Sequence, residues 1–353
     1  MKSDVYLARV SSKKTEDRAL ALKRLLEKAA PFSHYQKKEI IPLKLTIGDS
    51  SCVYNVSPDL VKIIVSEIKK QGVKPFLFDT SVIYHGERQN AVSHLNLAQY
   101  KGFSHSKTGA PFVIADGLLG QDGREYETGS PNIPRIKVPS FVGMLDSLTV
   151  ITHVTGHILS VFAGSIKNVS MGMSCRPTKQ VQHSSLKPSV MVKKCTACGC
   201  CIAVCPVKAI SFRKDKAFID SAVCIGCGEC LCACKFEAIH INWEEDTDTF
   251  CKRMVDTAGC ILSKFKNKFF ISLALDVTKE CDCISDKNEK MIAQDIGILA
   301  SSDILSLDKA CADLVLQDKK ADYLRKSQGV FERMFSYAQD KGLGNEEYNL
   351  IEV

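Results

Sequence analysis

The 353-residue sequence lacks the features that mark a membrane protein or a secreted protein. No apolar run approaches the roughly 18 residues of a membrane span. The first residues, MKSDVYLARVSSKK, contain no apolar core of a secretion signal. We therefore expect a cytoplasmic protein with no membrane span.

Two common binding motifs are also missing. No G-x-G-x-x-G follows a predicted strand, so a nicotinamide or flavin site of the Rossmann type is not supported. The formal net charge is +7, but the basic residues form no stripe interleaved with aromatic residues, so we expect no nucleic-acid partner. The composition, with 45% hydrophobic and 25% charged residues, is that of an ordinary globular protein. The length alone suggests two or three domains.

Cysteine, by contrast, is abundant. The chain contains 17 cysteines, which in a protein without a secretion signal point to metal binding and away from disulfides. Ten of them lie in two runs, CTACGCCIAVCP from Cys195 and CIGCGECLCAC from Cys224. Each run contains C-x2-C-x2-C-x3-C, the spacing that holds a [4Fe-4S] cluster. The sequence therefore predicts two [4Fe-4S] clusters as cofactors, and their oxygen sensitivity suggests an anaerobe.

The spacing also predicts which cysteines share a cluster. Three thiolates of a run come from one tight turn, while the fourth begins a helix that points away and ligates the other cluster. The predicted ligand sets are Cys195, Cys198, Cys201 and Cys234 for one cluster, and Cys224, Cys227, Cys230 and Cys205 for the second. Cys200 and Cys232 are surplus. A single C-x2-C pair is also compatible with zinc, but two full copies of the iron-sulfur spacing favour clusters.

This stretch resembles a bacterial two-cluster ferredoxin domain. The first copy ends in the expected proline, Pro206, whereas Lys235 stands at the matching place in the second copy. We expect this departure to change the local backbone or the cluster potential without removing the site.

The rest of the chain shows an α/β pattern. Expected strands at 4–10, 43–47 and 75–79 alternate with a helix over 15–29 and a second helix that begins at Ser57 and Pro58. This order is typical of a mostly parallel sheet with flanking helices. Apolar strands at 148–152 and 269–277 lie on either side of the cysteine runs, and we expect them to be buried neighbours.

The predicted fold class is therefore α/β, with an inserted small α+β ferredoxin-like domain. Residues 1–186 form the first part of the α/β domain, residues 187–244 the two-cluster domain, and residues 245–353 the second part. Ligands of open α/β sheets bind at the carboxyl ends of strands. The polar segments Gly48-Asp49-Ser50 and Asp79-Thr80-Ser81 are thus candidates for a pocket rim, although helix caps and turns explain them equally.

A second candidate site follows two apolar strands. We predict that six residues converge on one pocket near the cluster domain: His153, His157, Lys167, Asn168, Cys281 and Cys283. The lysine would stabilise a developing anion, a histidine would move protons, and the thiols would act as nucleophiles or ligate a metal. A metal would need further ligands, such as a histidine or Cys175. The alternative is that these are hydrogen-bonded histidines and buried thiols with only structural roles.

Several motifs together resemble a known family. They are HVTGH from His153, GSIKN from Gly164 with Met171-Gly172, the ferredoxin insertion, KECDC from Lys279, and DIGILAS from Asp295 with Asp303 and Asp308. As a set they resemble the iron-sulfur proteins called domain of unknown function 362, over about residues 5–316. The resemblance implies the fold and the two cubane clusters, and it identifies no reaction.

Three functions remain open from the sequence. The first is an oxidoreductase in which the two clusters carry electrons from a redox partner, such as a ferredoxin, to a small-molecule substrate in the α/β domain. The second is a non-enzymatic electron carrier or assembly subunit. The third is a metal-dependent isomerase, lyase or maturation enzyme with structural clusters. A closed, polar cavity that holds His153, Lys167 and Cys281 would favour an enzyme, and a broad apolar surface would favour a docking subunit.

Overall fold

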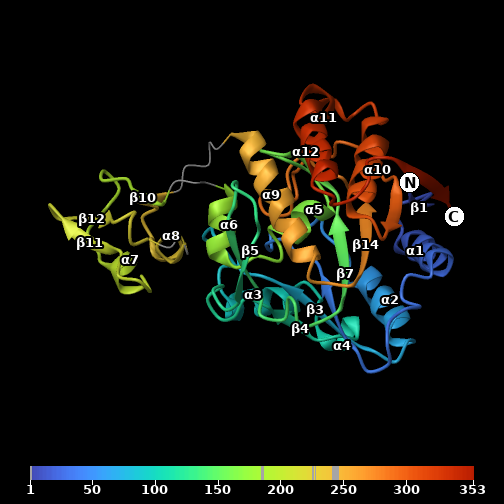
Figure 1. The fold of residues 1–353 in the computed structure, drawn as a ribbon, viewed down its shortest axis with the longest axis horizontal. Helices are drawn as coiled ribbons and strands as arrows, with labels where there is room; N and C mark the ends of the chain where they lie inside the picture. Colours follow the sequence, from blue (N-terminus) through green and yellow to red (C-terminus); the bar gives the residue numbers. More distant parts are fainter. Residues whose placement is uncertain (1, 184–186, 225, 227, 241–245) are drawn as a thin grey trace.

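The computed structural model describes residues 2–183, 187–224, 226, 228–240 and 246–353. An eight-stranded sheet forms the body of the protein (Figure 1). In spatial order its strands are β16 (Tyr348–Glu352), β1 (Ser3–Arg9), β15 (Gly297–Ser301), β14 (Asn267–Ala274), β7 (Ser147–His153), β2 (Ile40–Lys44), β3 (Lys74–Asp79) and β4 (Phe112–Ile114). All neighbouring strands pair in parallel except β15, which is antiparallel to both β14 and β1. The predicted α/β fold class, with a mostly parallel sheet, is confirmed.

Helices cover both faces of this sheet. One face packs against α1 (Thr15–Ala29), α2 (Pro58–Lys69) and α3 (Ala91–Tyr100), and the other against α5 (Ser165–Ser170), α9 (Thr247–Leu262), α10 (Ile304–Leu316) and α12 (Gln328–Asp340). Strand β14 shows why both faces are closed, because Phe270 and Ala274 enter one core while Phe269 and Ile271 enter the other. Such a strand is buried on both sides.

Smaller elements complete the body. They are α4 (His105–Thr108), α6 (Arg176–His183), α11 (Asp322–Lys326), the hairpin of β5 (Arg124–Glu127) with β6 (Arg135–Val138), and the hairpin of β8 (Thr155–His157) with β9 (Val161–Ala163). Among the described residues, no helix is both long enough and apolar enough to cross a membrane.

The clearest predicted helix forms for the expected reasons. The Ser57 hydroxyl accepts a hydrogen bond from the Asp59 backbone N–H (3.3 Å), and Pro58 occupies the first turn of α2. Five apolar side chains of α2 are buried against the sheet: Leu60, Val61, Ile64, Val65 and Ile68. The cap and the apolar stripe together fix where this helix begins and which face it buries.

The chain before and after the cysteine runs shares one sheet. Strands β7 and β14 pair in parallel from Ser147 and Asn267 to His153 and Leu273, as predicted for the two apolar strands. The sequence did not predict β15 as a strand; it returns antiparallel to the sheet from the loop that follows β14. The segment bounds at 186/187 and 244/245 stay predictions, because 186, 244 and 245 lie outside the described residues.

The cysteine-rich segment projects from one side of this body (Figure 1). It contains two short helices, α7 (Cys200–Ala203) and α8 (Glu229–Ala233). Two antiparallel pairs complete it: β10 (Ser189–Val190) with β13 (Ile239–His240), and β11 (Ile210–Arg213) with β12 (Lys216–Ile219). We call residues 187–240 the cluster module, after the cofactors that its sequence predicts.

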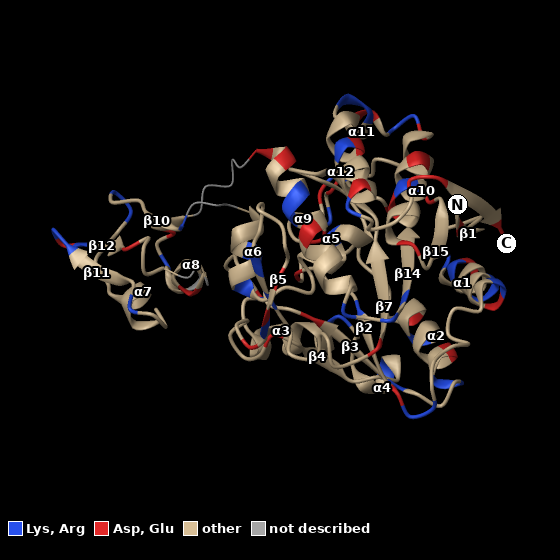
Figure 2. Ribbon diagram, viewed as in Figure 1, with Lys and Arg blue, Asp and Glu red and all other residues tan. Residues whose placement is uncertain are grey.

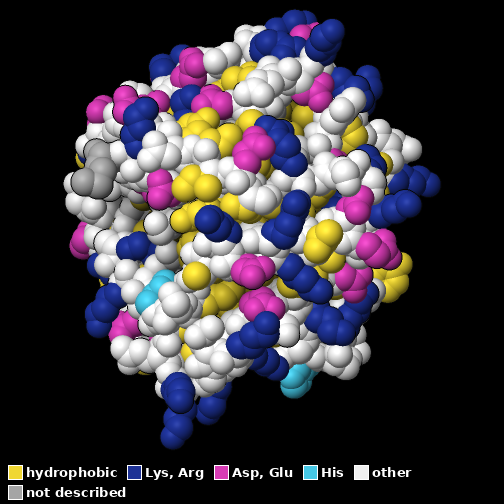
Figure 3. Space-filling model, turned by 90° about the vertical axis from the view of Figure 1, so that its right-hand side faces the viewer, with side chains coloured by type: hydrophobic (Ala, Val, Ile, Leu, Met, Phe, Trp, Pro, Cys, Tyr) yellow, Lys and Arg dark blue, Asp and Glu magenta, His cyan; other side chains and the backbone are white. Residues whose placement is uncertain are grey.

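Charges of both signs are distributed over the ribbon (Figure 2). On the face opposite the cluster module, Lys and Arg side chains alternate with Asp and Glu (Figure 3). Ion pairs such as Arg9–Glu352 (2.8 Å) and Arg18–Asp295 (2.5 Å) join the strands and helices there. This face therefore carries no continuous basic stripe.

Candidate functional site

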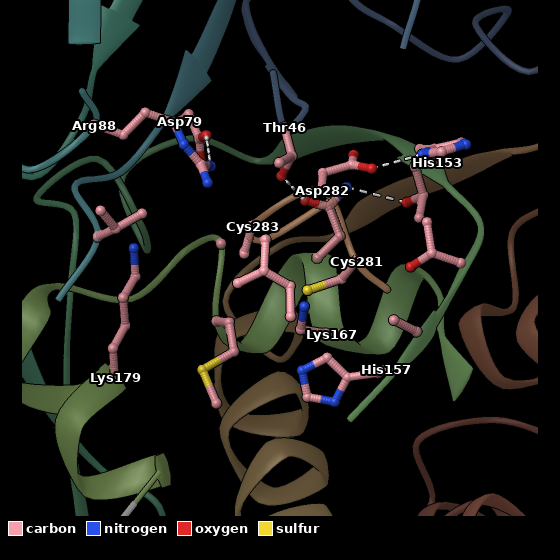
Figure 4. A pocket seen from close by; sticks show the side chains of 18 of the residues that line it. Thr46, Asp79, Arg88, His153, His157, Lys167, Lys179, Cys281, Asp282 and Cys283 are labelled. Carbon is pink, nitrogen blue, oxygen red and sulfur yellow. Dashed lines mark hydrogen bonds and ion pairs between the residues drawn. The ribbon is translucent and has the colours of Figure 1, made fainter. Parts of the chain in front are cut away.

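A cavity of about 500 Å³ lies at the carboxyl edge of the sheet, a volume typical of small-molecule sites. The parallel strands β14, β7, β2 and β3 all point their carboxyl ends toward it, and those ends are Ala274, His153, Lys44 and Asp79. The structure brings every residue of the predicted second site to its wall: His153, His157, Lys167, Asn168, Cys281 and Cys283. Figure 4 labels all of these except Asn168.

The two cysteines lie in a tight turn on the loop after β14. The backbone N–H groups of Ile284 and Ser285 both donate to the Cys281 carbonyl (3.0 Å each). Inside this turn the two thiols hydrogen-bond to one another, and Lys167 contacts Cys281. Cys281 is buried and Cys283 is partly buried.

Charge divides the roles of the two sulfurs. The hydrogen bond from the Cys281 thiol, together with the positive charges of Lys167 and Arg88, holds the pKa of Cys283 well below its ordinary value although burial opposes this. The same hydrogen bond and burial raise the pKa of Cys281 well above its ordinary value. Both shifts favour a thiolate at Cys283 that faces the thiol of Cys281. A thiolate is the nucleophilic form of cysteine.

His153 anchors this loop. Its Nδ1 lies 2.7 Å from Asp282 Oδ1, and its Nε2 lies 2.9 Å from the Leu275 carbonyl oxygen. Burial opposes protonation, but the Asp282 carboxylate outweighs burial and raises the pKa of His153. Both ring nitrogens are thus engaged by protein atoms, so His153 positions the residue between the two cysteines and has no ring nitrogen directed at a substrate.

His157 is a different kind of histidine. Its Nδ1 accepts hydrogen bonds from the backbone N–H groups of Leu159 (3.2 Å) and Ser160 (3.1 Å), and the ring stacks on Phe250 with centroids 5.6 Å apart. Burial, with the nearby charge of Lys167, lowers its pKa well below the ordinary value. His157 is therefore neutral, with its proton on Nε2, and is suited to donate a hydrogen bond.

Asn168 belongs to a buried polar network that the sequence did not reveal. Its Oδ1 accepts from Lys44 Nζ (2.8 Å), while its Nδ2 donates to the Ile151 carbonyl (3.0 Å) and to Thr152 Oγ1 (3.1 Å). Lys44 also pairs with Asp79 Oδ1 (3.0 Å). Asn168 thus joins β2 to β7 through side-chain contacts.

Further charged residues complete the cavity wall. Arg88 Nε donates to Asp49 Oδ1 (2.8 Å), and Lys179 Nζ donates to Thr80 Oγ1 (2.7 Å). Burial lowers the pKa of Lys179 to about 8. Of the two polar strand ends predicted as a rim, 79–81 supplies Asp79 and Thr80 to the wall. The other, 48–50, does not line the cavity, although Asp49 accepts the hydrogen bond from Arg88. The sequence also held a signal that the prediction missed, which is Lys44, a charged residue at the end of an otherwise apolar strand.

The proposed extra metal ligands do not assemble here. Cys175 lies apart from the cavity, where its thiol faces the Asp122 carbonyl (3.6 Å). Within the described ranges, no three His, Cys, Asp or Glu side chains converge as the ligands of a single metal ion do. The thiol pair is thus better described as two sulfur atoms near the positive charges of Lys167 and Arg88 than as part of a mononuclear metal site.

The cluster module contains two small hollows lined by cysteines. One is lined by Cys195, Cys198, Cys200, Cys201 and Cys234, and the other by Cys205, Cys224 and Cys230. Each hollow thus groups described cysteines of one predicted crossed set, the first with Cys200 in addition, and their binding of clusters stays a prediction. Cys227 and the side chain of Cys232 lie outside the described residues.

The chemistry of these hollows fits the predicted cofactors. Apolar residues such as Ile210 and Phe212 surround the sulfurs. Backbone N–H groups donate to the sulfurs, as from Ala209 to Cys205 (3.2 Å) and from Ala238 to Cys234 (3.2 Å). Such hydrogen bonds stabilise a thiolate and tune a cluster's potential.

The second cysteine run touches the body beside the cavity. Gly228 of this run packs next to Ile83, which lines the cavity. A Cβ atom added to Gly228 would lie 3.8 Å from Ile83 Cβ. Arg176 Nη1 of the body pairs with Glu229 Oε1 of α8 (2.5 Å), and its Nη2 donates to the Gly228 carbonyl (3.2 Å). The segment next to Cys230 is therefore fixed against the cavity wall by a buried ion pair.

The family model described as Domain of unknown function (DUF362) matches residues 41–313. This chain belongs to the DUF362 family. No curated protein matches it. Among solved structures, the DUF362 chain is similar to a protein from Thermotoga maritima, with a TM-score of 0.41 and 11% identity over 93% of this chain and 59% of that one. It is also similar to the lactate racemase apoprotein from Thermoanaerobacterium thermosaccharolyticum, with a TM-score of 0.36 and 12% identity over 78% of this chain and 51% of that one. The chain thus spans between half and three fifths of the length of these two proteins.

Proposed function

We propose that this DUF362 protein is an iron-sulfur oxidoreductase. It takes electrons from a redox partner protein such as a ferredoxin, carries them through two [4Fe-4S] clusters, and delivers them to a small molecule in the cavity of the α/β body. One cluster is held by Cys195, Cys198, Cys201 and Cys234, and the other by Cys205, Cys224, Cys227 and Cys230. The clusters supply one-electron transfer, and the body supplies binding and protons.

The grouping of the cysteines supports the cofactor assignment. Spacing alone assigned the fourth cysteine of each run to the opposite cluster, and the two hollows group Cys234 with Cys195 and group Cys205 with Cys224. The fourth cysteine was expected to begin a helix, but in each run it follows one: Cys205 comes after α7, and Cys234 directly follows α8.

The observation that carries the proposal is the contact between the second run and the cavity wall. Gly228 stands beside Cys230, and Ile83 is both its neighbour and a lining residue of the cavity. The segment that would hold the second cluster therefore contacts a residue of the cavity wall. Cys198 lines the first hollow and its side chain is exposed to solvent. This hollow is therefore suited to exchange electrons with a partner protein.

The cavity supports an enzyme over a docking subunit. The cavity is open on one side and its wall is mostly apolar, so it departs from the closed, polar cavity expected of an enzyme, but Lys167, His157 and a thiol pair converge in it. Lys167 offers a positive charge for a developing anion, and neutral His157 offers a hydrogen bond.

Two measurements test the proposal. Anaerobic reconstitution should give about eight iron and eight sulfide per chain, and a single zinc would contradict it. The reduced protein is then mixed with pyruvate or with 2-hydroxyethyl disulfide, two small probes that a cavity lined by a lysine and thiols can accept. If the clusters deliver electrons to the probe, the absorbance of the oxidised clusters should return.

The variant Lys167→Ala separates delivery through the cavity from direct reaction at the clusters. We expect it to retain iron and sulfide but to slow reoxidation strongly. Glu237→Gln, an exposed change in the cluster module, is the control and should reoxidise at the normal rate. Reoxidation that Lys167→Ala leaves unchanged with both probes would mean that electrons leave from the module surface.

A further inference from the structure

Cys281 and Cys283 are the two thiols among the six predicted residues of the cavity wall. The other four carry imidazole, amino or amide groups. A disulfide needs two Cα atoms roughly 4.4–6.8 Å apart, and one tight turn holds both cysteines. The pKa of each thiol is shifted by a side-chain hydrogen bond to the other. The two sulfur atoms are therefore neighbours in the reduced protein.

The surroundings keep this turn in place. Asp282, between the two cysteines, is held by His153 at 2.7 Å. On the other side, Tyr84 Oη donates to the Cys283 carbonyl (3.4 Å) and is itself held by Arg88 Nη2 (2.5 Å). A turn fixed on both sides holds Cys281 and Cys283 near each other.

Charge makes the pair reactive. Arg88 and Lys167 both contact the sulfurs and favour the thiolate of Cys283. A thiolate attacks disulfides, and a neighbouring thiol resolves the mixed disulfide that forms. The other buried thiol near this loop, Cys52, accepts a hydrogen bond from Ser285 Oγ (3.1 Å) and lies near Lys101, but burial and the charge of Asp282 outweigh both and raise its pKa to about 11.

The cavity wall includes residues that reach solvent and a residue that contacts the cluster module. Ile158 (66% exposed) and Ile284 (58% exposed) both line it and both reach the surface, so the thiol loop is next to the opening. Ile83, which also lines the cavity, contacts the cluster module. A small molecule can therefore reach the thiol pair from solvent in a cavity that the cluster module adjoins.

We propose that Cys281 and Cys283 form a redox-active dithiol that reduces the disulfide of a low-molecular-weight thiol. This inference rests on the proposed function, because the two reduced clusters supply the electrons. The Cys283 thiolate attacks the substrate disulfide and releases one thiolate. The Cys281 thiol then attacks the mixed disulfide and releases the second thiol. The Cys281-Cys283 disulfide takes up two electrons, one from each cluster, and one proton, which restores the thiol and the thiolate.

The pair is tested without reference to activity. The full chain is equilibrated anaerobically in buffers of reduced and oxidised dithiothreitol, then alkylated with iodoacetamide and analysed by peptide mass. We expect the peptide with residues 281–283 to change from two alkyl groups to none in a single two-electron transition. Cys52→Ser should behave in the same way. Full alkylation of both cysteines in every buffer would overturn the proposal.

A reductive titration connects the pair to the clusters. Oxidised protein should take up four electron equivalents per chain, two for the clusters and two for the disulfide, and Cys283→Ser should take up two at unchanged iron content. Two equivalents in both proteins would reject the dithiol. Absence of iron would reject the proposed function instead, while the alkylation experiment still decides whether the disulfide forms.

The substrate class is tested with 2-hydroxyethyl disulfide. The reduced protein should consume it, and Cys283→Ser should lose at least 100-fold in rate while keeping its cluster absorbance. Consumption of this disulfide by Cys283→Ser at the normal rate would show that the clusters react directly, and would overturn the assignment.

Discussion

The ion pair between Arg176 and Glu229 should determine how firmly the cluster module is held against the body. Both side chains are buried, and Glu229 Oε1 also accepts from Gln121 Nε2 (3.1 Å). Removal of one partner of a buried pair leaves an uncompensated charge and typically costs about 3–5 kcal/mol. Glu229→Gln keeps the shape and one hydrogen-bond acceptor, so we expect the lower end, about 3 kcal/mol.

The same substitution at Glu237 is a matched control. Glu237 pairs with Lys194 at 3.8 Å in the same module, but the two side chains are 86% and 52% exposed. Exposed pairs contribute about 0–1 kcal/mol. Glu237→Gln should therefore leave the module nearly as stable as in the native protein.

Native-state hydrogen exchange of the amides of α8 measures this difference. A loss of about 3 kcal/mol raises local opening on the order of 100-fold, whereas the control should change it less than about 5-fold. The cluster absorbance, measured in parallel, confirms that the cofactors stay bound. If both variants exchange at the same rate, the ion pair does not hold the module in place.

Three further outcomes are expected. Cys205→Ala should lose the cluster of the second run, and with it about four irons per chain, whereas Cys200→Ala should keep all iron; equal losses in both variants would contradict the crossed assignment. His94 is buried and burial lowers its pKa from 6.5 to about 3, so the unfolded state binds its proton first and the free energy of unfolding falls as the pH drops below 6.5. His94→Leu should flatten that fall in urea titrations between about pH 6 and 4, and an unchanged slope would assign it to other groups. Lys167→Met should shift the pH profile of Cys283 alkylation toward higher pH, because a positive charge next to the thiolate is lost; a profile that does not move would mean that Lys167 does not stabilise the thiolate.

Local sequence signals predicted much of the fold. The Ser57 cap and the apolar stripe of α2 depend on neighbours in the chain, and so does the apolar character of β7 and β14. The reversed direction of β15 depends on pairing across the sheet, and no local pattern encodes it. Strand bounds moved for the same reason: the strand expected at 43–47 is β2, Ile40–Lys44.

The candidate site shows the same division. Residues at the ends of apolar strands, such as His153 and the Cys281-Cys283 loop, were found because parallel strands bring their carboxyl ends together. Lys44 was missed because the strand expected at 43–47 placed it inside a strand, whereas it ends β2, and because its partner Asp79 comes from a different strand. Arg88 was missed because its role depends on contacts with Asp49 and Tyr84 that only the folded chain creates.

The central position of β15 has a consequence for synthesis of the chain. Strand β1 is made first, but its partners are β15 and β16, and the register places Tyr6 opposite Ala300. At a translation rate of about 5–20 residues per second, β1 waits roughly 15 to 60 s for that partner. During this time its backbone groups are an open edge that can pair with other chains. The sheet therefore closes only after the cluster module has left the ribosome, so that cluster insertion into the module can precede completion of the body that encloses the cavity.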